Sequence, residues 1–426
     1  MKHQTQLIIV LTIIAVVALP LFFIVIPANQ PIGLPLDVDY LTEGDYAGNF
    51  LVTDNIGKVL IVDTELNVLW ESDVPERFCH ESGLLPDGNI IVADTAVGRV
   101  IELNISDPND IVWEWDPRNP ADINWTELAI RAGWSQKAID YVQNPKADWA
   151  HTNDAEWING TKLGRTYDSL MISLRNFNLI LEVNYTDTKE VIWWYGEPED
   201  YNTLNHQHNP DVRDNGNVII CDSENRRIIE VNYTTKEVVW KFRLDFPFGE
   251  LRWARDCDDI GNDTYMITDS NNGRVFFVDR ETKTIVKEFG GWYLIQPYEA
   301  DYVEIDGKHW ILVGDSPSTA ITLIDPESDT FIVYGFPSIP NYLRLFVGLF
   351  STYYAFMFIS QFLAVKDQSV INRLKKPSVY RELTYLILSI IILIFGGSLY
   401  RYLVEFGLWK IMDNAIHNWA VSGNLF

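Results

Sequence analysis

Short runs of β-prone residues recur along the middle of this chain in a fixed order. Each unit has a short apolar run, a tight turn, a β-rich run ending in Asp, a polar turn, a third run, and a fourth run that often carries Trp. Three clear copies read LLPDGNIIVADTAVGRVIEL, VRDNGNVIICDSENRRIIEVNYTTKEVVW and DDIGNDTYMITDSNNGRVFFVDRETKTIVKEF, and three less regular copies begin near Gly48, Ala150 and Tyr298. Repeats of about 40 to 50 residues with four short strands are typical of propeller blades. The pattern predicts an all-β, six-bladed β-propeller over residues 28–341.

Other segments depart from this repeat. Residues 116–148 contain two pieces with helical periodicity, WTELAIRAG and SQKAIDYVQ, which predicts a helical insertion. Three long apolar runs flank the repeats, at Leu7–Ile26, Leu343–Val365 and Leu383–Tyr400. Runs of about 20 apolar residues are long enough to cross a bilayer. We therefore expect an N-terminal transmembrane anchor within residues 1–27 and two transmembrane helices within residues 342–426.

The charges beside these runs predict which side of the membrane the propeller occupies. The loop 366–382 is rich in Lys and Arg, and Lys2 precedes the first run. Cytoplasmic loops are enriched in Lys and Arg, so both segments should be inside and residues 28–341 outside the cytoplasm. The tail after Arg401 is expected at the membrane interface. A cleaved signal peptide is the alternative for residues 1–27, although its apolar region is usually shorter, about 7 to 15 residues.

Sequons for N-glycosylation agree with an outside position. Six N-x-S/T sites, all within the predicted propeller, are Asn104, Asn124, Asn159, Asn184, Asn232 and Asn262. Possible N-glycans at these sites are therefore expected, although a chance cluster is the alternative because the pattern is short.

Composition excludes several classes of protein. The formal net charge is −26, which excludes nucleic acid as the main partner because phosphates must be neutralised by cations. Three cysteines exclude a small disulfide-stapled scaffold and a four-cysteine zinc site. We expect all three cysteines to be free.

Candidate chemistry begins with histidines that share one position of the repeat. His80, His151 and His208 immediately precede the first strand of three successive units, and His206 lies close by. The first strand of each blade lines the central channel, so these side chains should converge on one mouth of it. The alternative is that each histidine caps its own strand and bonds a neighbouring carbonyl.

An arginine joins this group in the third unit. The second strand ends in Asp followed by Ser or Thr in four of the units, but Leu174 and Arg175 stand at this point. Arg175 can therefore reach the channel mouth beside His151, unless it is a surface arginine paired with an acidic neighbour. Three imidazoles and a guanidinium suit an anion with several oxygens. A zinc or copper site on the histidines ranks second, because the guanidinium opposes a cation, so no metal is expected.

The stretch from Trp149 to Asp222 resembles the aryl sulfotransferase family, the bacterial enzymes that do not use a nucleotide sulfate donor. The likeness rests on WAHTN, SLRN, VIWWYG, NHQHNPD and NGNVIICD. The family's fold is a six-bladed propeller, in agreement with the number of repeats. The resemblance implies catalytic roles for His208 as the nucleophile, and for His151, His80 and Arg175. It implies substrate-binding roles for Asn153, from the H-x-N motif, and for His206, which is the alternative nucleophile.

The resemblance also implies a reaction without a cofactor. An imidazole attacks the sulfur of a phenolic sulfate ester, the phenol leaves, and a phenolic acceptor then takes the sulfuryl group from the sulfohistidine. Two other functions stay open. A non-catalytic extracellular propeller that binds a glycan or a surface protein would use the histidines only structurally. A quinone or metal oxidoreductase is disfavoured by six blades and by the lack of an adjacent cysteine pair.

Overall fold

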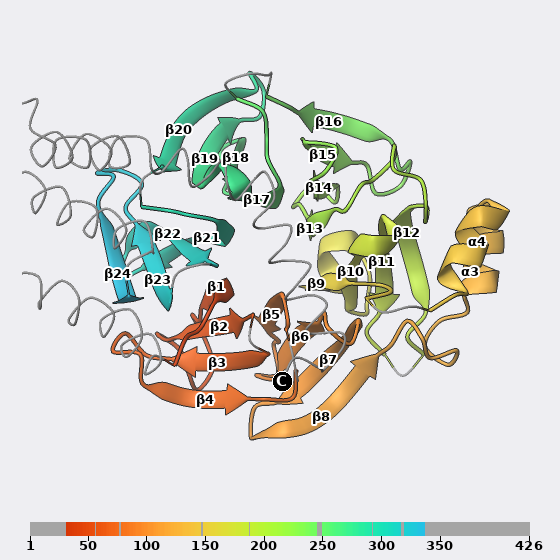
Figure 1. Cartoon of the computed structure of the whole chain (residues 1–426), viewed down its shortest axis with the longest axis horizontal. Coiled ribbons are helices and arrows are strands. Elements are labelled where there is room, and N and C mark those ends of the chain that lie inside the picture. The colour runs from red at the N-terminus through yellow and green to blue at the C-terminus, as the bar shows by residue number, and fades with distance from the viewer. Residues whose placement is uncertain are drawn as a thin grey trace, which may run out of the picture. The chain divides into compact units, whose positions relative to one another are not determined.

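The computed structural model describes residues 31–336, except residues 56, 76–77, 146–147, 187, 245–248, 292 and 317–318. These residues form six four-stranded sheets, each made of four consecutive strands. Figure 1 shows the sheets arranged as blades around one axis, with the first strand of each blade innermost. The predicted all-β, six-bladed propeller is confirmed.

All strand pairs are antiparallel neighbours in the chain. Blade 1 contains β1 (Pro35–Tyr40), β2 (Phe50–Asp54), β3 (Lys58–Val62) and β4 (Val68–Ser72). Blade 2 contains β5 (Glu81–Leu84), β6 (Ile90–Asp94), β7 (Arg99–Asn104) and β8 (Asp107–Trp115). Blade 3 contains β9 (Thr152–Ile158), β10 (Ser169–Leu174), β11 (Leu179–Asn184) and β12 (Val191–Gly196). Blade 4 contains β13 (His208–Val212), β14 (Val218–Asp222), β15 (Arg227–Val231) and β16 (Val238–Phe242). Blade 5 contains β17 (Ala254–Asp259), β18 (Thr264–Asp269), β19 (Arg274–Asp279) and β20 (Thr284–Gly290). Blade 6 contains β21 (Pro297–Ile305), β22 (Lys308–Asp315), β23 (Thr319–Ile324) and β24 (Phe331–Phe336).

The second strand is buried along its whole length in four blades, in β2, β6, β10 and β14. Both faces of the sheet pack against neighbouring blades, which is why these strands read as continuous apolar runs. The Asp that ends the strand accepts a backbone N–H from the segment leading into the inner strand of the same blade. The distances are 2.7 Å from Asn205 N to Asp222, 2.7 Å from Arg252 N to Asp269 and 2.8 Å from Gln296 N to Asp315. This contact helps to fix where each inner strand begins.

Tryptophans of three outer strands join blade 1 to blade 2, blade 3 to blade 4 and blade 4 to blade 5. The indole N–H of Trp70 donates to Ile105 O at 3.0 Å, that of Trp193 to Tyr233 O at 2.7 Å, and that of Trp240 to Arg280 O at 2.8 Å. A buried indole needs such an acceptor. These three tryptophans therefore help to hold neighbouring blades together.

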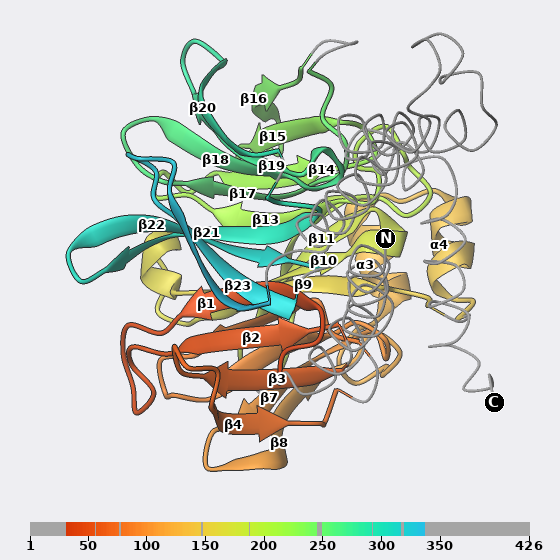
Figure 2. The ribbon, with the colours of Figure 1, turned by 60° about the vertical axis from the view of Figure 1, so that its left-hand side comes forward.

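The ring closes by packing between blade 6 and blade 1, because each blade is made from one continuous segment. Strand β1 contacts β21 and β22, and Figure 2 shows β1 beside β23. At this seam a Cβ on Gly314 would lie 2.5 Å from Leu36 O, so the close approach requires glycine.

The helical insertion is present as predicted. Helix α3 (Trp125–Ala132) has Asn124 as its N-cap, and α4 (Gln136–Val142) follows after a short turn. The Trp125 ring packs edge-on against Phe177 with 5.4 Å between centroids, and the Tyr141 hydroxyl donates to Asn176 O at 3.2 Å. The insertion thus supports the turn Arg175–Phe177, which carries a candidate site residue.

Two other predictions concern membrane helices and cysteines. Within the described part of the chain, no helix has the length and apolar character to cross a membrane. The three predicted transmembrane runs, in residues 1–27 and 342–426, lie outside the described residues. The three cysteines, Cys79, Cys221 and Cys257, are free, as predicted, and buried.

Candidate active site

Three inner strands carry a histidine at or just before their first residue. His80 precedes β5, His151 precedes β9, and His208 is the first residue of β13. The three side chains are buried, with exposed fractions of 8%, 7% and 4% in that order. Blades 2, 3 and 4 are neighbours in the ring (Figure 1), so the shared repeat position brings these histidines to the same end of the channel.

His80 and His151 are in direct contact. Their ring centroids are 5.0 Å apart in an edge-on arrangement, and Phe78 packs against both rings at 5.7 and 6.1 Å. The phenyl ring removes water from one side of the pair, which strengthens electrostatic interactions there.

His208 is held in one tautomer by a hydroxyl group. Its Nδ1 lies 2.9 Å from Ser223 Oγ. The single hydroxyl hydrogen of Ser223 is taken by carbonyl oxygens, Ala254 O at 2.6 Å and Cys221 O at 3.3 Å, which can only accept. Ser223 Oγ must then accept from His208, which places the proton on Nδ1. The lone pair is consequently on Nε2, so Nε2 is the atom of His208 that can act as a nucleophile.

His151 has a carboxylate partner instead. Its Nδ1 lies 2.7 Å from Asp148 Oδ1, and the Asn176 side-chain amide donates to Asp148 Oδ2 at 3.0 Å. Asn176 Oδ1 in turn accepts from Arg175 Nη1 at 3.2 Å. One hydrogen-bonded chain therefore connects His151 to Arg175, and the negative Asp148 stabilises positive charge on His151.

Aromatic rings connect the arginines to the histidines. The Arg175 guanidinium carbon lies 5.4 Å from the Trp253 ring centroid, and the His208 ring lies 6.1 Å from the same ring. Trp253 also lies 5.9 Å from the guanidinium of Arg255. Trp253 therefore faces both guanidinium groups and the imidazole of His208.

A tyrosine completes the cluster from blade 6. The Arg255 guanidinium lies 3.6 Å from the ring centroid of Tyr298, and the Tyr298 hydroxyl lies 2.7 Å from His80 Nδ1. The cluster thus includes side chains from blades 2 to 6, with two guanidinium groups among three imidazoles.

Burial and neighbouring cations keep two imidazoles neutral. Burial is the largest cause that lowers the pKa of His80 and of His208 well below its ordinary value. For His80 the next causes are His151, Arg255 and Arg175, and for His208 they are Arg255 and Arg175. Both imidazoles are therefore unprotonated and nucleophilic at neutral pH.

Asn153 and Gln207 position the segment that precedes β13. The Asn153 amide donates to Gln207 O at 3.0 Å, and the Gln207 amide donates to Ser173 Oγ and to Leu179 O, both at 3.0 Å. The Gln of the Q-H pair thus anchors the backbone beside His208. The oxygen Oδ1 of Asn153 is buried and accepts no hydrogen bond from the described residues.

His206 is the predicted site residue that lies apart from this cluster. Its Nδ1 is 3.2 Å from Glu224 Oε2, and its ring centroid is 6.4 Å from that of Tyr201. His208, by contrast, has His80, His151, Arg175 and Arg255 as its charged or titratable neighbours. The geometry therefore favours His208 over His206 as the nucleophile.

The repeat places Arg255 near the histidine position in blade 5, but the sequence analysis assigned no role to Arg255 and did not select Trp253 or Tyr298. Arg255, Tyr298 and Asn153 share a structural position, because each is left out of strand pairing by a β-bulge near the start of its inner strand. Each also directly precedes an acidic residue. Aligning the repeats on that acidic residue would have placed all three in one column.

The three histidines do not form a metal-ligand set in the described part of the chain. The groups of potential ligand atoms within 4.8 Å of one another contain only carboxylates. Each histidine Nδ1 already has a partner, at Tyr298, Asp148 or Ser223. The arrangement suits an anion better than a metal ion.

Comparison with known families supports the resemblance predicted from the motifs. Residues 47–209 match the profile of the arylsulfotransferase (ASST) family. The matched range contains His80, His151, Arg175 and His208, and it ends before Arg255. Among curated proteins, none matches the chain significantly.

Solved structures with a similar arrangement of strands have low sequence identity. A protein of unknown function from Bacteroides caccae is 12% identical, with a TM-score of 0.40, over 57% of this chain and 78% of its own. A streptogramin B lyase is 11% identical, with a TM-score of 0.45, over 74% of this chain and 87% of its own. Virginiamycin B lyase from Staphylococcus aureus is 10% identical, with a TM-score of 0.43, over 72% of this chain and 90% of its own.

Proposed function

We propose that this chain, with its arylsulfotransferase family match over residues 47–209, is an aryl sulfotransferase that transfers a sulfuryl group between phenols through a sulfohistidine on His208. The observation that carries the proposal is the position of His208. Its Nδ1 is held by Ser223, while the guanidinium groups of Arg175 and Arg255 lie around the same cluster. A neutral nucleophile beside fixed cations suits attack on a sulfate ester.

In the first step, the Nε2 lone pair of His208 forms a bond to sulfur as the bond from sulfur to the phenolic oxygen breaks. The phenol leaves with the electron pair of that bond. His151 is the best proton donor for it, because Asp148 at 2.7 Å stabilises its protonated form. In the second step a phenolic acceptor oxygen forms a bond to the sulfur as the bond from sulfur to His208 Nε2 breaks and its electron pair returns to Nε2. The proton of the acceptor phenol returns to His151.

Negative charge on the three transferring oxygens needs fixed positive partners. The planar guanidinium of Arg175 can donate two hydrogen bonds to such a group, and Arg255 supplies a second cation. Because Trp253 and Tyr298 hold these groups in place by ring contacts, little reorganisation is needed as the charge develops. Enzymes that transfer phosphoryl groups also stabilise the charge on the transferring oxygens with fixed cations.

The direct test uses an activated aryl sulfate. Without an acceptor, the protein should release about one phenol per chain and gain one sulfuryl group on the peptide that contains His208. Adding a phenolic acceptor should restore continuous release. Absence of both phenol release and the adduct would favour the alternative, a non-catalytic propeller that binds a glycan or surface protein.

The pH dependence of the first step follows from the lowered pKa of His208. An ordinary imidazole is half-protonated at about pH 6.5. Because burial and the nearby arginines lower the pKa of His208, it should stay neutral and reactive below that pH. An aryl sulfate whose phenolate leaves without a proton should therefore show a constant single-turnover rate from pH 8 to 6.5. A loss of rate centred at pH 6.5 or above would contradict this assignment.

We also propose that the propeller is anchored in the cell membrane and faces the extracytoplasmic side. The supporting features are the apolar runs, the basic loop 366–382 and the sequons. In intact cells, a membrane-impermeant reagent should label a cysteine introduced at Asp263 but not one introduced in the loop 366–382. Labelling of both from one side would overturn this topology.

A further inference from the structure

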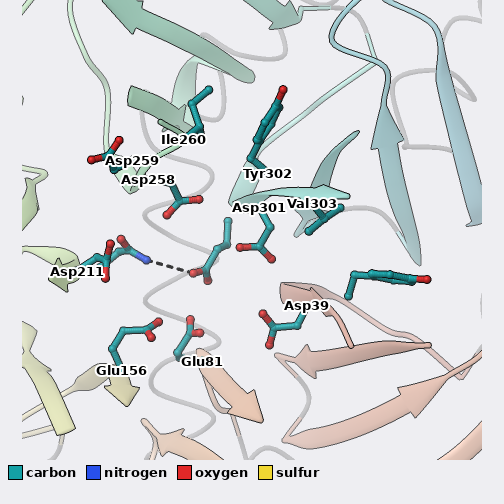
Figure 3. Close-up of a pocket in the computed structure, with 13 residues that line it drawn as sticks. Asp39, Glu81, Glu156, Asp211, Asp258, Asp259, Ile260, Asp301, Tyr302 and Val303 are labelled. Atoms are coloured by element: carbon teal, nitrogen blue, oxygen red, sulfur yellow. Dashed lines mark hydrogen bonds between the residues drawn. The ribbon is translucent and has the colours of Figure 1, made fainter. Parts of the chain in front are cut away.

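Below the histidines, the channel is lined by carboxyl groups from all six inner strands. A cavity of about 520 Å³ lies there, and Figure 3 shows the carboxylates of Asp39, Glu81, Glu156, Asp258 and Asp301 pointing toward one another. Asp37, Asp154 and Asp256 each stand two residues before one of the lining carboxylates and interact with them. Ten acidic side chains therefore gather in this part of the channel: Asp37, Asp39, Glu81, Asp154, Glu156, Asp211, Asp256, Asp258, Glu299 and Asp301. The basic side chain Lys162 is near enough to act on two of them, Glu156 and Asp211.

Two triads within this group have the spacing of a cation site. Oxygens of Asp37, Asp39 and Asp301 lie within 4.8 Å of one another, and so do those of Asp37, Glu81 and Glu299. Calcium–oxygen distances are about 2.3 to 2.6 Å, so two ligands on opposite sides of one Ca²⁺ are separated by about 5 Å. Each triad can therefore close around a single ion.

The residue shared by both triads is already held in position. Asp37 is 1% exposed, and its Oδ2 accepts hydrogen bonds from Thr53 Oγ1 and Ser82 N, both at 3.1 Å. These donors come from the second strand of its own blade and from the inner strand of blade 2. Such second contacts orient a ligand carboxylate before the ion binds.

Buried oxygens without hydrogen-bond partners give a second, independent indication of a ligand. Asn209 lines the cavity and is 6% exposed; its amide donates to Glu299 at 3.3 Å, while its Oδ1 has no partner among the described residues. Asp154 is 2% exposed, and its Oδ1 also has none. The acidic groups that act on Asp154 include residues of blades 1, 4 and 5, so it faces the axis. Buried polar atoms left unpaired are costly, and a cation in the cavity that Asn209 lines would give such an oxygen a partner.

We propose that this channel binds a hard divalent cation, Ca²⁺ in preference to Mg²⁺, through Asp37, Glu81 and Glu299 or through Asp37, Asp39 and Asp301. Carboxylate and amide oxygens are the donors that such cations prefer, and no sulfur or nitrogen ligand takes part. Ca²⁺ accepts six to eight oxygens in irregular geometry, which fits donors from several strands, whereas Mg²⁺ demands a near-octahedral set. This ion differs from the zinc or copper considered for the histidines.

The ion would connect blades through shared ligands, including blades 1 and 6, where the ring closes by packing. Its ligands come from β1, β5 and β21, and therefore include both sides of the seam between blades 1 and 6. Glu81 directly follows His80, and Asn209 directly follows His208. The cation would thus stabilise the ring at its seam and fix the strand starts below the histidines, whether or not the protein transfers sulfuryl groups.

The test is calorimetric titration of the full-length, EDTA-treated protein with CaCl₂ and with MgCl₂ at about 0.15 M salt, which screens exposed charges. Saturable Ca²⁺ binding and a melting temperature raised by several degrees are expected, with at least tenfold weaker Mg²⁺ binding. The double variant E299Q/D301N removes one carboxylate from each triad. It should lose Ca²⁺ affinity by tenfold or more.

The melting temperature of the cation-free variant distinguishes loss of the cation site from a folding defect. Removing mutual repulsion should leave this temperature unchanged or raise it, while the Ca²⁺-dependent increase disappears. D263N changes one exposed aspartate in the same way and should bind Ca²⁺ like the wild type. The proposal is overturned if Ca²⁺ neither binds nor stabilises the wild type, if Mg²⁺ binds as tightly, or if E299Q/D301N binds Ca²⁺ normally. None of these outcomes depends on sulfuryl transfer.

Discussion

His208→Asn is expected to abolish both the sulfuryl adduct and the turnover of aryl sulfates. The amide nitrogen of Asn is not nucleophilic at neutral pH, whereas Nε2 of His208 carries a lone pair because Ser223 holds the proton on Nδ1. Loss of the nucleophile from a covalent mechanism removes most of the rate, so a decrease of about 10⁴-fold or more is expected. Phenol release and the mass of the His208 peptide are the two measurements.

Two matched variants make this result specific. His309 is exposed on β22, so His309→Asn should leave activity unchanged. His206→Asn tests the alternative nucleophile, and because His206 contacts Glu224 rather than the cluster, the adduct should still form. If His206→Asn removed the adduct and His208→Asn did not, the nucleophile would be misassigned.

The convergence of the histidines was predictable because the repeat makes positions equivalent. Once His80, His151 and His208 stand at one place in successive units, propeller geometry brings them to one mouth of the channel. The substitution of Arg175 for a small turn residue was visible for the same reason. It sits in the turn Arg175–Phe177, which the insertion supports.

The role of Arg255 in blade 5 and the position of Tyr298 in blade 6 were hidden by local backbone geometry. Arg255 stands near the position where blades 2 to 4 carry histidine, but a β-bulge near the start of the inner strand decides which side chain enters the cluster, and the repeat alone does not show it. The contact between Asp148 and His151 was hidden as well. These residues are three positions apart, and both adopt positive φ, at 49° each. A sequence pattern does not reveal such a turn.

The acidic channel was not predicted for a different reason. The net charge of −26 describes the whole chain and does not say which carboxyl groups face the axis. Asp39 and Asp301 lie on inner strands, where alternate side chains point into the channel rather than into water. Burial then raises the pKa of Asp301 to about 7, far from the value of an exposed aspartate.

Replacing Arg175 by Lys is expected to slow sulfuryl transfer by about 10²-fold or more, in line with the removal of one preorganised donor. Lysine keeps the positive charge, but it lacks the planar pair of donors that can bind two sulfuryl oxygens. It also lacks the guanidinium plane that faces Trp253 and the N–H that Asn176 accepts at 3.2 Å.

The effect of Arg175→Lys should appear in kcat more than in KM, because charge on the transferring oxygens increases in the transition state. Arg118→Lys provides the matched control, since Arg118 is half-exposed and pairs with Asp116 in the insertion. This control should keep the wild-type rate. Equal kcat for Arg175→Lys and the wild type would mean that the guanidinium does not stabilise the transferring group, and the charge would then have to be balanced by Arg255, the second guanidinium of the cluster. In that case Arg255→Lys, rather than Arg175→Lys, would produce the loss in kcat.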